Sequence, residues 1–530
     1  MRILNLKQLI ITIITSIFLS ILFSPSPNAY SQNITTTQST IDSYIQEQMR
    51  LLEIPGVALA VVHEDQVYTQ GYGVAGSDGR VMTPQTPFLI ASLSKPITAL
   101  AIMQLVEAGK IDLDQPVRSY LPWFQVKDSE GSEQISVRHL LNQTSGFSER
   151  EGYLRNIKID HSNNALEQSI QLLSSSNLNN PPGETFEYSN TNFDVLGFLI
   201  ETVSGQSYED YIQTQIFDPL EMRNSHTYLE QARDNGLASG YTSFFGNPLV
   251  IDRILPYSRI TKPSAGLFSS PEDLSHLLMA HLNNGSYAEN QLISPNGLTT
   301  LFTPGPKIGD EVYYGLGWVR FPFPDAATNN NGIPTVFSHA GDWIGYKSIM
   351  LLIPEKDLGV VVLMNKSDPI QPSAFFNLGW NVALITLGVD PVDYPPAENF
   401  IARYLRMLLT VLIILLLAEL FWTSRFLSRM QDSPNQKSFK RMIAISISFG
   451  IMDILLAGYL LLIKLPESKS SLLLTLRFEP DIGLLYTVII ILTLGWGIIR
   501  SIWVFRKSTY KISDGESTLT SNSQSSESQP

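Results

Sequence analysis

Apolar and polar positions along the chain separate a large mixed region from an apolar C-terminal third. Three long apolar runs lie in that third, at 407–422, 442–463 and 484–504. The second and third runs match the roughly 20 residues that cross a bilayer, and the first is shorter but almost entirely aliphatic. A helix that is apolar on every face over such a length is rarely the core helix of a soluble protein. The pattern therefore predicts three transmembrane helices, at residues 405–423, 442–463 and 483–504.

Basic residues between these runs predict how the helices are oriented. The first loop, 424–441, carries five Lys or Arg residues, and three more follow the last run. The loop 464–481 has fewer basic residues, and acidic residues balance them. Because basic loops stay in the cytoplasm, we expect the first loop and the C-terminal tail inside the cell. The region that precedes the first helix then lies outside the cytoplasm.

The N-terminus indicates the same compartment. Arg2 and Lys7 precede an apolar run at 9–23, prolines come next, and Ala29 and Ser31 are small residues at the positions that determine cleavage. This pattern is typical of a secretory signal peptide at residues 1–31, and an uncleaved N-terminal anchor is the alternative. Under both interpretations the globular domain is exported. We therefore expect a multi-pass protein of the cell membrane whose globular domain is periplasmic or at the cell surface.

Two segments outside the apolar runs lack the pattern of a packed domain. A stiff linker is predicted at 389–404, which contains Pro391, Pro395 and Pro396. Residues 513–530 are rich in Ser, Gln and Glu and show no apolar period, so we expect a disordered tail. The globular domain is therefore predicted at residues 32–388.

Helix and strand patterns are mixed within this domain. Residues 37–52 have amphipathic helical spacing, and residues 373–386 suit a final helix. Four apolar runs predict two hairpins, at 57–62 with 67–71 and at 346–353 with 360–364. Strands near both ends of the domain, with helical segments between them, favour an α+β fold with one antiparallel sheet closed by its two termini.

Composition excludes several classes of function. The formal net charge is −13, although residues 405–511 hold 13 Lys and Arg against 6 Asp and Glu, so the globular domain is strongly acidic. An acidic domain without a basic stripe argues against binding to nucleic acid. The chain has no cysteine, which excludes disulfides, thiolate metal sites and a cysteine nucleophile.

A candidate nucleophile begins the motif S-x-x-K at Ser92 and Lys95, where an apolar stretch gives way to helical spacing. Positions i and i+3 share a helix face, so the two side chains are expected to point the same way. A lysine kept neutral by burial can remove the serine proton or assist another base, and N–H groups of the first helical turn can bind an oxyanion. Pro96 fixes where this helix starts, since proline is tolerated in a first turn. By itself S-x-x-K is a weak signal in a chain rich in serine.

Two later motifs contain chemically suitable side chains. The motif Y-x-N occurs at Tyr188 and Asn190, and H-x-G occurs at His339 and Gly341, shortly before a predicted strand. A tyrosine near a cationic lysine can have its pKa lowered enough to act as a base, whereas an isolated Y-x-N is more often a packed tyrosine with a capping asparagine. His339 can donate a hydrogen bond or polarise the tyrosine, although a lone histidine is more often structural. Gly341 at a strand edge lets a substrate backbone approach.

In chain order, S-x-x-K, Y-x-N and H-x-G resemble the motifs of the class C β-lactamase-like serine hydrolases, a family with penicillin-binding D-peptidases and esterases. Segments 55–57, 138–146, 263–269 and 314–318 also look familial, and the resemblance covers about 37–387. It implies a β-lactamase/transpeptidase-like fold, in which an antiparallel sheet flanked by helices meets a helical lobe at the active site. No metal or organic cofactor is implied.

The resemblance also implies which residues form the site. These are Ser92, Lys95, Tyr188 and His339 for catalysis, with Asn190, Gly341 and Asp342 for contacts to substrate and oxyanion. Ser92 is implied as the nucleophile, with Lys95 and Tyr188 as the base system. The oxyanion hole is implied at the N–H groups of Ser92 and Asp342.

One departure from the family pattern affects the expected substrate. His339 stands where true class C β-lactamases have lysine, which suits a peptidase, amidase or esterase better than efficient penicillin hydrolysis. We therefore expect acyl transfer to Ser92 from a small D-amino-acid-containing peptide, an amide or an ester, followed by hydrolysis.

Other functions stay open as alternatives. An exported domain followed by three spans resembles membrane-bound peptidases that remove an acyl-D-amino-acid cap from natural-product precursors. A β-lactamase is another alternative, and a non-catalytic membrane sensor or binding protein that retains the fold is a third. Intact Ser92, Lys95, Tyr188 and His339 argue against the sensor.

Two carboxylates fall within the predicted spans, with Asp453 in the middle of the second and Glu419 near the inner end of the first. Carboxylates inside a membrane are costly and often functional. No Lys or Arg is apparent at the depth of Asp453, so an interhelical contact or a role in oligomerisation is expected for it.

Overall fold

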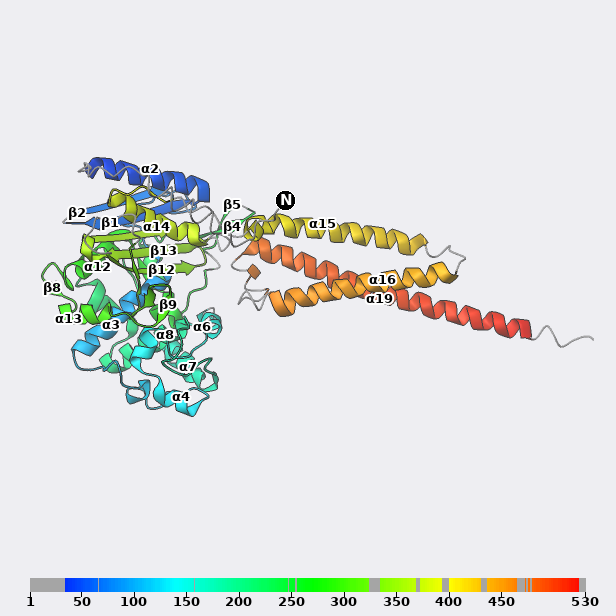
Figure 1. The fold of residues 1–530 in the computed structure, drawn as a ribbon, viewed down its shortest axis with the longest axis horizontal. Helices are drawn as coiled ribbons and strands as arrows, with labels where there is room; N and C mark the ends of the chain where they lie inside the picture. The colour runs from blue at the N-terminus through cyan, green and yellow to red at the C-terminus, as the bar shows by residue number, and fades with distance from the viewer. Residues whose placement is uncertain are drawn as a thin grey trace, which may run out of the picture.

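The computed structural model describes residues 34–523 apart from 65, 157, 246, 253–254, 324–333, 368–371, 393–399, 430–435, 465–471, 473–474 and 477–478. The predicted signal peptide at 1–31 and the last residues of the predicted tail lie outside this range. Figure 1 shows a globular domain of layered strands and helices from which long helices project on one side.

An antiparallel sheet crosses the globular domain, with the strand order β2-β1-β14-β13-β12-β11-β10-β9 among the described residues. The strands are β1 Gly56–His63, β2 Gln66–Gly73, β9 Lys307–Gly309, β10 Val312–Tyr314, β11 Val319–Pro322, β12 Thr335–Trp343, β13 Tyr346–Ile353 and β14 Leu358–Met364. β1 pairs with β14 so that Val57 lies opposite Met364. This pairing confirms an α+β fold whose antiparallel sheet is closed by the two ends of the domain.

The central strands of the sheet are buried on both faces. Odd-numbered residues from Val57 to Val61 pack in one core with α2 (Ile34–Leu52) and α14 (Pro372–Thr386). Even-numbered residues from Ala58 to Val62 pack in a second core with α3 (Ser94–Glu107) and α12 (Pro271–Leu282). A strand covered on both faces needs no polar alternation, which explains the continuous apolar run of β1.

A helical lobe lies below the sheet in the view of Figure 1. Its helices are α4 Ser129–Gln134, α5 Val137–Leu141, α6 Glu149–Asn156, α7 Ala165–Gln171 and α8 Asn190–Ser204. Further helices are α9 Tyr208–Ile212, α10 Leu229–Asp234, α11 Lys262–Ala265 and α13 Pro295–Leu301. Short strands are β3 Phe88–Leu89 with β6 Phe268–Ser269, β7 Ser286–Tyr287 with β8 Asn290–Gln291, and β4 Tyr241–Phe244 between β5 Asn247–Val250 and β15 Lys366–Ser367. α8 packs against both α3 and α11, which joins the lobe to the sheet domain.

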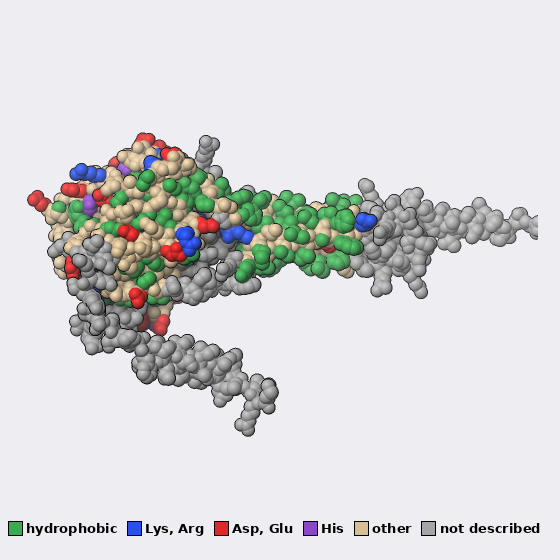
Figure 2. Space-filling model, turned by 90° about the horizontal axis from the view of Figure 1, so that it is seen from above, with side chains coloured by type: hydrophobic (Ala, Val, Ile, Leu, Met, Phe, Trp, Pro, Cys, Tyr) green, Lys and Arg blue, Asp and Glu red, His purple; other side chains and the backbone are tan. Residues whose placement is uncertain are grey.

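The projecting bundle consists of α15 (Phe400–Arg429), α16 (Gln436–Tyr459, followed by a π-helical turn at Leu460–Lys464) and α19 (Pro480–Ser523). Two helical segments in the described residues are long and apolar enough to cross a bilayer: Tyr404–Arg425 and Pro480–Arg500. The apolar stretch of α16 is shorter, at Ile447–Leu462. A third span at 442–463 is therefore not confirmed, because the apolar stretch of α16 among the described residues is shorter than the roughly 20 residues a span requires. Figure 2 shows that hydrophobic side chains predominate on the coloured part of the bundle in that view.

An ion-pair network joins the three helices of the bundle. Arg500 of α19 pairs with Glu419 of α15, and its guanidinium lies 3.4 Å from a carboxylate oxygen of Asp453 on α16. The interhelical contact expected of Asp453 is therefore present. The expectation that no Lys or Arg lies at its depth was wrong, because Arg500 belongs to the third apolar run and faces inward.

Helix α19 continues to Ser523 and so enters the segment predicted as a disordered tail. Once a helix is nucleated, each added residue fixes one pair of backbone dihedrals and gains one hydrogen bond, so a polar segment can extend a long helix. Residues 513–523 are helical in the structure for this reason.

Candidate active site

Ser92 lies at the junction of the sheet and the helical lobe. It is the middle residue of a 3₁₀ turn, Ala91–Leu93, that leads directly into α3. Ala91 has φ of 49°, a left-handed conformation that costs a non-glycine residue about 1–3 kcal/mol and is typical of functional turns. The side chain of Ser92 is partly exposed, whereas the residues on either side of it are buried. The turn therefore presents the hydroxyl of Ser92 to solvent from a rigid base.

Lys95 is the nearest cation to this hydroxyl in the part of the chain that the structure describes. Its amine donates hydrogen bonds to Ser92 Oγ at 3.1 Å, to Asn190 Oδ1 at 2.6 Å and to the Ser264 carbonyl at 2.8 Å. Lys95 is fully buried. Burial lowers the pKa of its amine to about 7, against the opposing effect of the Asp194 carboxylate. A neutral amine is therefore accessible near neutral pH, and such an amine can accept the proton of Ser92.

Tyr188 contacts the same serine from the lobe, just before α8. Its hydroxyl donates a hydrogen bond to Ser92 Oγ at 3.0 Å, and the amine of Lys95 lies 4.7 Å from its ring centre. Burial raises the pKa of Tyr188 above its ordinary value. The expectation of a lowered pKa for this tyrosine was wrong, because desolvation of the phenolate outweighs the opposing effect of the hydrogen bond to Ser92. Tyr188 is thus a protonated hydrogen-bond donor, and Lys95 is the better-suited base.

His339 lies on β12 with its ring beside Tyr188, at 6.4 Å between ring centres. Its Nδ1 lies 2.9 Å from the Ala340 carbonyl, and its Nε2 lies 3.3 Å from the hydroxyl of Tyr314. The carbonyl requires a proton on Nδ1, so Nε2 accepts from Tyr314. Burial, with a smaller effect from the nearby Lys95 amine, lowers the pKa of His339 to about 3. The imidazole is therefore neutral and forms one wall of the site.

Gly341 brings β12 against the turn that holds the serine. A Cβ at this position would lie 2.5 Å from the Ile90 carbonyl oxygen and 3.1 Å from the Cβ of Ala91. Only glycine permits this approach, which sets the strand edge beside the backbone that precedes Ser92. Asp342 comes next in β12, with an exposed carboxylate that pairs with Lys347 at 2.6 Å.

Asn190 begins α8 and bonds Lys95, and one turn later the same helix face presents a residue that the motif analysis missed. Asp194 is 3% exposed. Burial raises the pKa of its carboxyl to about 7, while the Ser264 hydroxyl and the Lys95 amine oppose that rise. Burial therefore moves the pKa of both groups toward neutrality, and each group partly opposes that shift in the other. The i, i+4 spacing from Asn190 is the sequence signal that could have identified it.

Tyr314 is a second residue whose role the sequence did not reveal. Besides bonding His339, its ring meets Tyr188 edge-on at 6.3 Å between centres. It therefore holds both aromatic members of the site. Its segment, 314–318, was noted only as a familial sequence.

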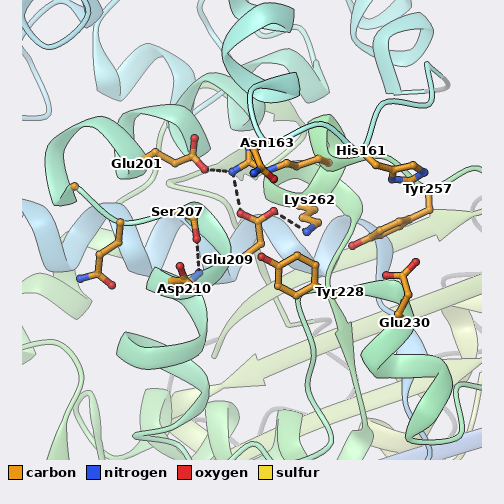
Figure 3. A pocket seen from close by; sticks show the side chains of 13 residues that line it. His161, Asn163, Glu201, Ser207, Glu209, Asp210, Tyr228, Glu230, Tyr257 and Lys262 are labelled. Carbon is orange, nitrogen blue, oxygen red and sulfur yellow. Dashed lines mark hydrogen bonds and ion pairs between the residues drawn. The ribbon is translucent and has the colours of Figure 1, made fainter.

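A cavity of about 650 Å³ lies at the start of α11, and Figure 3 shows the side chains that line it. Within it Glu209 accepts hydrogen bonds from Lys262 at 2.6 Å and Arg259 at 3.0 Å. Lys262 begins α11, and two residues later the Ser264 carbonyl accepts from Lys95. Ser92 does not line this cavity, and we interpret the charged cluster as a brace for α11 rather than as a substrate site.

The structure thus brings Ser92, Lys95, Tyr188 and Asn190 into direct hydrogen-bond contact and places His339 and Gly341 beside them. Among the described residues, no group of three His, Cys, Asp or Glu side chains could hold a metal ion.

Comparisons with known proteins agree with this geometry. Residues 41–377 match the family model described as Beta-lactamase. The protein flp of Staphylococcus aureus (strain N315) is 29% identical over 391 residues, which cover 72% of this chain and 73% of that protein. The penicillin-binding protein 4* of Bacillus subtilis (strain 168) is 28% identical over 330 residues, covering 60% of this chain and 69% of that protein. The octameric penicillin-binding protein homologue from Pyrococcus abyssi has a similar structure, with a TM-score of 0.57, 29% identity, and coverage of 68% of this chain and 79% of that one.

Proposed function

Because this chain belongs to the beta-lactamase family of serine hydrolases, which includes penicillin-binding protein homologues, we propose that it hydrolyses a small peptide, amide or ester through an acyl-enzyme on Ser92. The observation that carries the proposal is the convergence of two side chains, the buried Lys95 and the half-buried Tyr188, on one hydroxyl. Lys95 Nζ lies 3.1 Å and Tyr188 Oη 3.0 Å from Ser92 Oγ.

In the acylation step, Ser92 Oγ attacks the substrate carbonyl carbon while its proton passes to the neutral amine of Lys95. The oxyanion that forms accepts hydrogen bonds from the backbone N–H groups of Ser92 and Asp342. The bond from carbon to the leaving group then breaks, and the proton reaches the leaving group from Lys95 through the hydroxyl of Tyr188. Water repeats these steps in the second half-reaction and releases the acid, which regenerates the serine.

The neutral state of His339 supports a particular substrate range. The pKa of His339 is lowered to about 3, so the imidazole offers no positive charge to a substrate carboxylate. A lysine at this position would supply such a charge, and without it we favour D-amino-acid-containing peptides, amides and esters over penicillins. A peptidase that removes an acyl-D-amino-acid cap from a natural-product precursor is a narrower form of the same proposal.

We also propose that the protein is anchored in the cell membrane with its catalytic domain outside the cytoplasm. Two apolar helices of 22 and 21 residues support the anchoring. The basic loop 424–441 and the N-terminal apolar run support the orientation.

Covalent labelling tests the enzyme proposal. The full-length protein in detergent is treated with a fluorescent fluorophosphonate and, separately, with a fluorescent penicillin. We expect fluorophosphonate labelling that disappears in Ser92→Ala and persists in the matched control Ser94→Ala, which removes a neighbouring hydroxyl that bonds the Ala91 carbonyl. Panels of esters and D-peptides then define the substrate. A folded protein that is unlabelled and inert on these panels would favour a membrane sensor that retains the fold.

A further inference from the structure

The hairpin of β4 and β5 exposes apolar side chains in a domain whose surface is otherwise mixed. Phe244 is 36%, Phe245 44%, Leu249 40% and Val250 37% exposed, and we call these four residues the hairpin tip. The rings of Phe244 and Phe245 pack edge to face at 5.0 Å. β5 is the edge strand of its three-stranded sheet. β5 carries Pro248, a residue that commonly protects edge strands, but it has no charged residue. A clustered apolar patch marks an interaction site.

The hairpin tip is tied to the level at which both candidate spans begin. The backbone N–H of Phe245 donates to a carboxylate oxygen of Asp481 at 2.9 Å, and Arg406 pairs with the same oxygen. Asp481 is the second residue of the span Pro480–Arg500, and Arg406 is the third residue of the span Tyr404–Arg425. The Asp481 side chain is fully buried. This contact fixes the hairpin tip at the outer ends of the helices, and Figure 1 shows β4 and β5 between the domain and the start of α15.

The apolar surface continues from the hairpin to the bundle. Met407 and Leu408 in the first turns of α15 are 54% and 42% exposed, and Leu484 in the first turn of α19 is 42% exposed. Figure 2 shows hydrophobic side chains running from the edge of the globular domain onto the bundle. Side chains at this level face the boundary between headgroups and acyl chains, where amphipathic and aromatic side chains gather. The occupant that fits a surface continuous with lipid-facing helices is therefore lipid.

From these observations we propose that the hairpin tip docks in the outer leaflet of the membrane and fixes the pose of the catalytic domain. This inference rests on the proposed membrane anchoring. It adds that the catalytic domain is held in one orientation relative to the bilayer.

The base of the hairpin packs against the turn that follows a strand of the active site. Gly240 precedes β4, and a Cβ added to it would lie 3.3 Å from the Cα of Gly345 in the turn between β12 and β13. A Cβ added to Gly345 would lie 2.6 Å from the side chain of Ile251, which follows β5. The hairpin and this turn are therefore in close backbone contact. β12 enters the same turn and carries His339 and Gly341. The docked hairpin and the strand that lines the site are therefore packed together, so docking sets the height of Ser92 above the bilayer.

A fluorescent label at a single cysteine tests the docking, because the natural chain has no cysteine and each introduced one is unique. Phe244→Cys in the full-length protein is labelled with an environment-sensitive fluorophore and placed in nanodiscs of phosphatidylethanolamine and phosphatidylglycerol. Spin-labelled lipids then quench the fluorophore according to depth. We expect at least about twofold quenching by a lipid labelled near its headgroup, as for a residue at the membrane interface.

Two matched variants separate the possible failures. Glu289→Cys lies in the exposed turn between β7 and β8, at the end of the domain away from the bundle in Figure 1, and is expected to show no quenching. Leu415→Cys, 60% exposed within the span of α15, is expected to be quenched most by a lipid labelled deep in its acyl chain. If Leu415→Cys is quenched while Phe244→Cys behaves like Glu289→Cys, docking of the hairpin is overturned and anchoring stands. If Leu415→Cys is unquenched as well, the anchoring itself is wrong. Circular dichroism of each labelled variant confirms that it is folded.

Discussion

The amine of Lys95 lies 3.1 Å from the hydroxyl oxygen of Ser92, and burial lowers the pKa of that amine to about 7. Only the deprotonated amine can accept the serine proton. The rate of acylation is therefore expected to rise as pH increases through about 7 and to level off above it. Rates of fluorophosphonate labelling between about pH 5 and about pH 9 measure this rise in the acylation rate. Lys95→Met is expected to lose it, and a wild-type rate that stays flat across the range would contradict the assignment.

Removing the hydroxyl of Tyr188 tests whether Tyr188 relays a proton from Lys95 or is itself the base that activates Ser92. Tyr188→Phe deletes the 3.0 Å hydrogen bond to Ser92, and positioned proton transfer is worth roughly 10²–10⁴-fold in rate. We expect turnover of an ester to fall by about that factor, while the rise in acylation through about pH 7 persists because it belongs to Lys95. If the rise disappears together with the hydroxyl, Tyr188 is the base instead.

Asp194 is expected to tune the base without touching the serine. Its carboxylate raises the pKa of Lys95, so Asp194→Asn should lower that pKa further and move the acylation midpoint to lower pH. The expected displacement is up to about one unit, because a nearby opposite charge shifts a pKa by roughly 1–3 units and Asp194 is only partly ionised near 7.

A matched control for this variant is Asp273→Asn. Asp273 is also a buried carboxylate, but it bonds Ser225 and Asn224 away from the serine. Its replacement is expected to leave the midpoint of acylation unchanged. A purely structural role of Asp194 would lower the rate at every pH and leave the midpoint in place.

Strands with strong apolar runs could be predicted from sequence, and weak ones could not. β1, β13 and β14 are buried on nearly every residue, so their runs are continuous. β9, β10 and β11 are three or four residues long, and most of their residues are exposed or half-buried at one end of the sheet. Such short segments carry neither alternation nor a long apolar run, and only pairing with neighbours makes them strands.

Within the site, spacing predicted contacts better than it predicted electrostatics. Ser92 and Lys95 are three residues apart on one turn, so their proximity is local. The sign of the shift at Tyr188 depends on burial, which a motif does not encode. Asp194 was missed because its i, i+4 spacing from Asn190 is a weak signal by itself, and its effect on Lys95 is apparent only in the folded structure. The pairing of Arg500 with Asp453 was missed because it depends on how α19 is aligned along α16, which the sequence does not reveal.

Replacement of His339 tests whether its imidazole takes part in titration. The pKa of His339 lies at about 3, so the ring is already neutral over the range in which Lys95 titrates. His339→Gln retains a donor and an acceptor, and we expect the midpoint of acylation to stay near 7. His339→Lys adds a like charge close to Lys95 and should move the midpoint to lower pH. A midpoint that disappears in His339→Gln would show that the histidine is the titrating base.

Arg500 pairs with two carboxylates from separate helices. Removing Arg500 alone should lower the stability of the bundle by more than the ion pairs contribute to it, because two uncompensated carboxylates remain. The side chain is 1% exposed, with Glu419 and Asp453 as its partners. Arg500→Leu leaves both carboxylates without a counter-charge, and loss of one partner of a buried ion pair costs about 3–5 kcal/mol. We therefore expect a clearly lower unfolding temperature for the purified full-length protein in detergent. Neutralising the orphaned groups with Glu419→Gln and Asp453→Asn in the same chain should recover much of that loss, because the cost arises from uncompensated charge rather than from a missing attraction. Ile499→Ala, one residue away and 57% exposed, controls for a change on α19 that leaves the network intact. Equal melting of Arg500→Leu and Ile499→Ala would mean that the network does not stabilise the bundle.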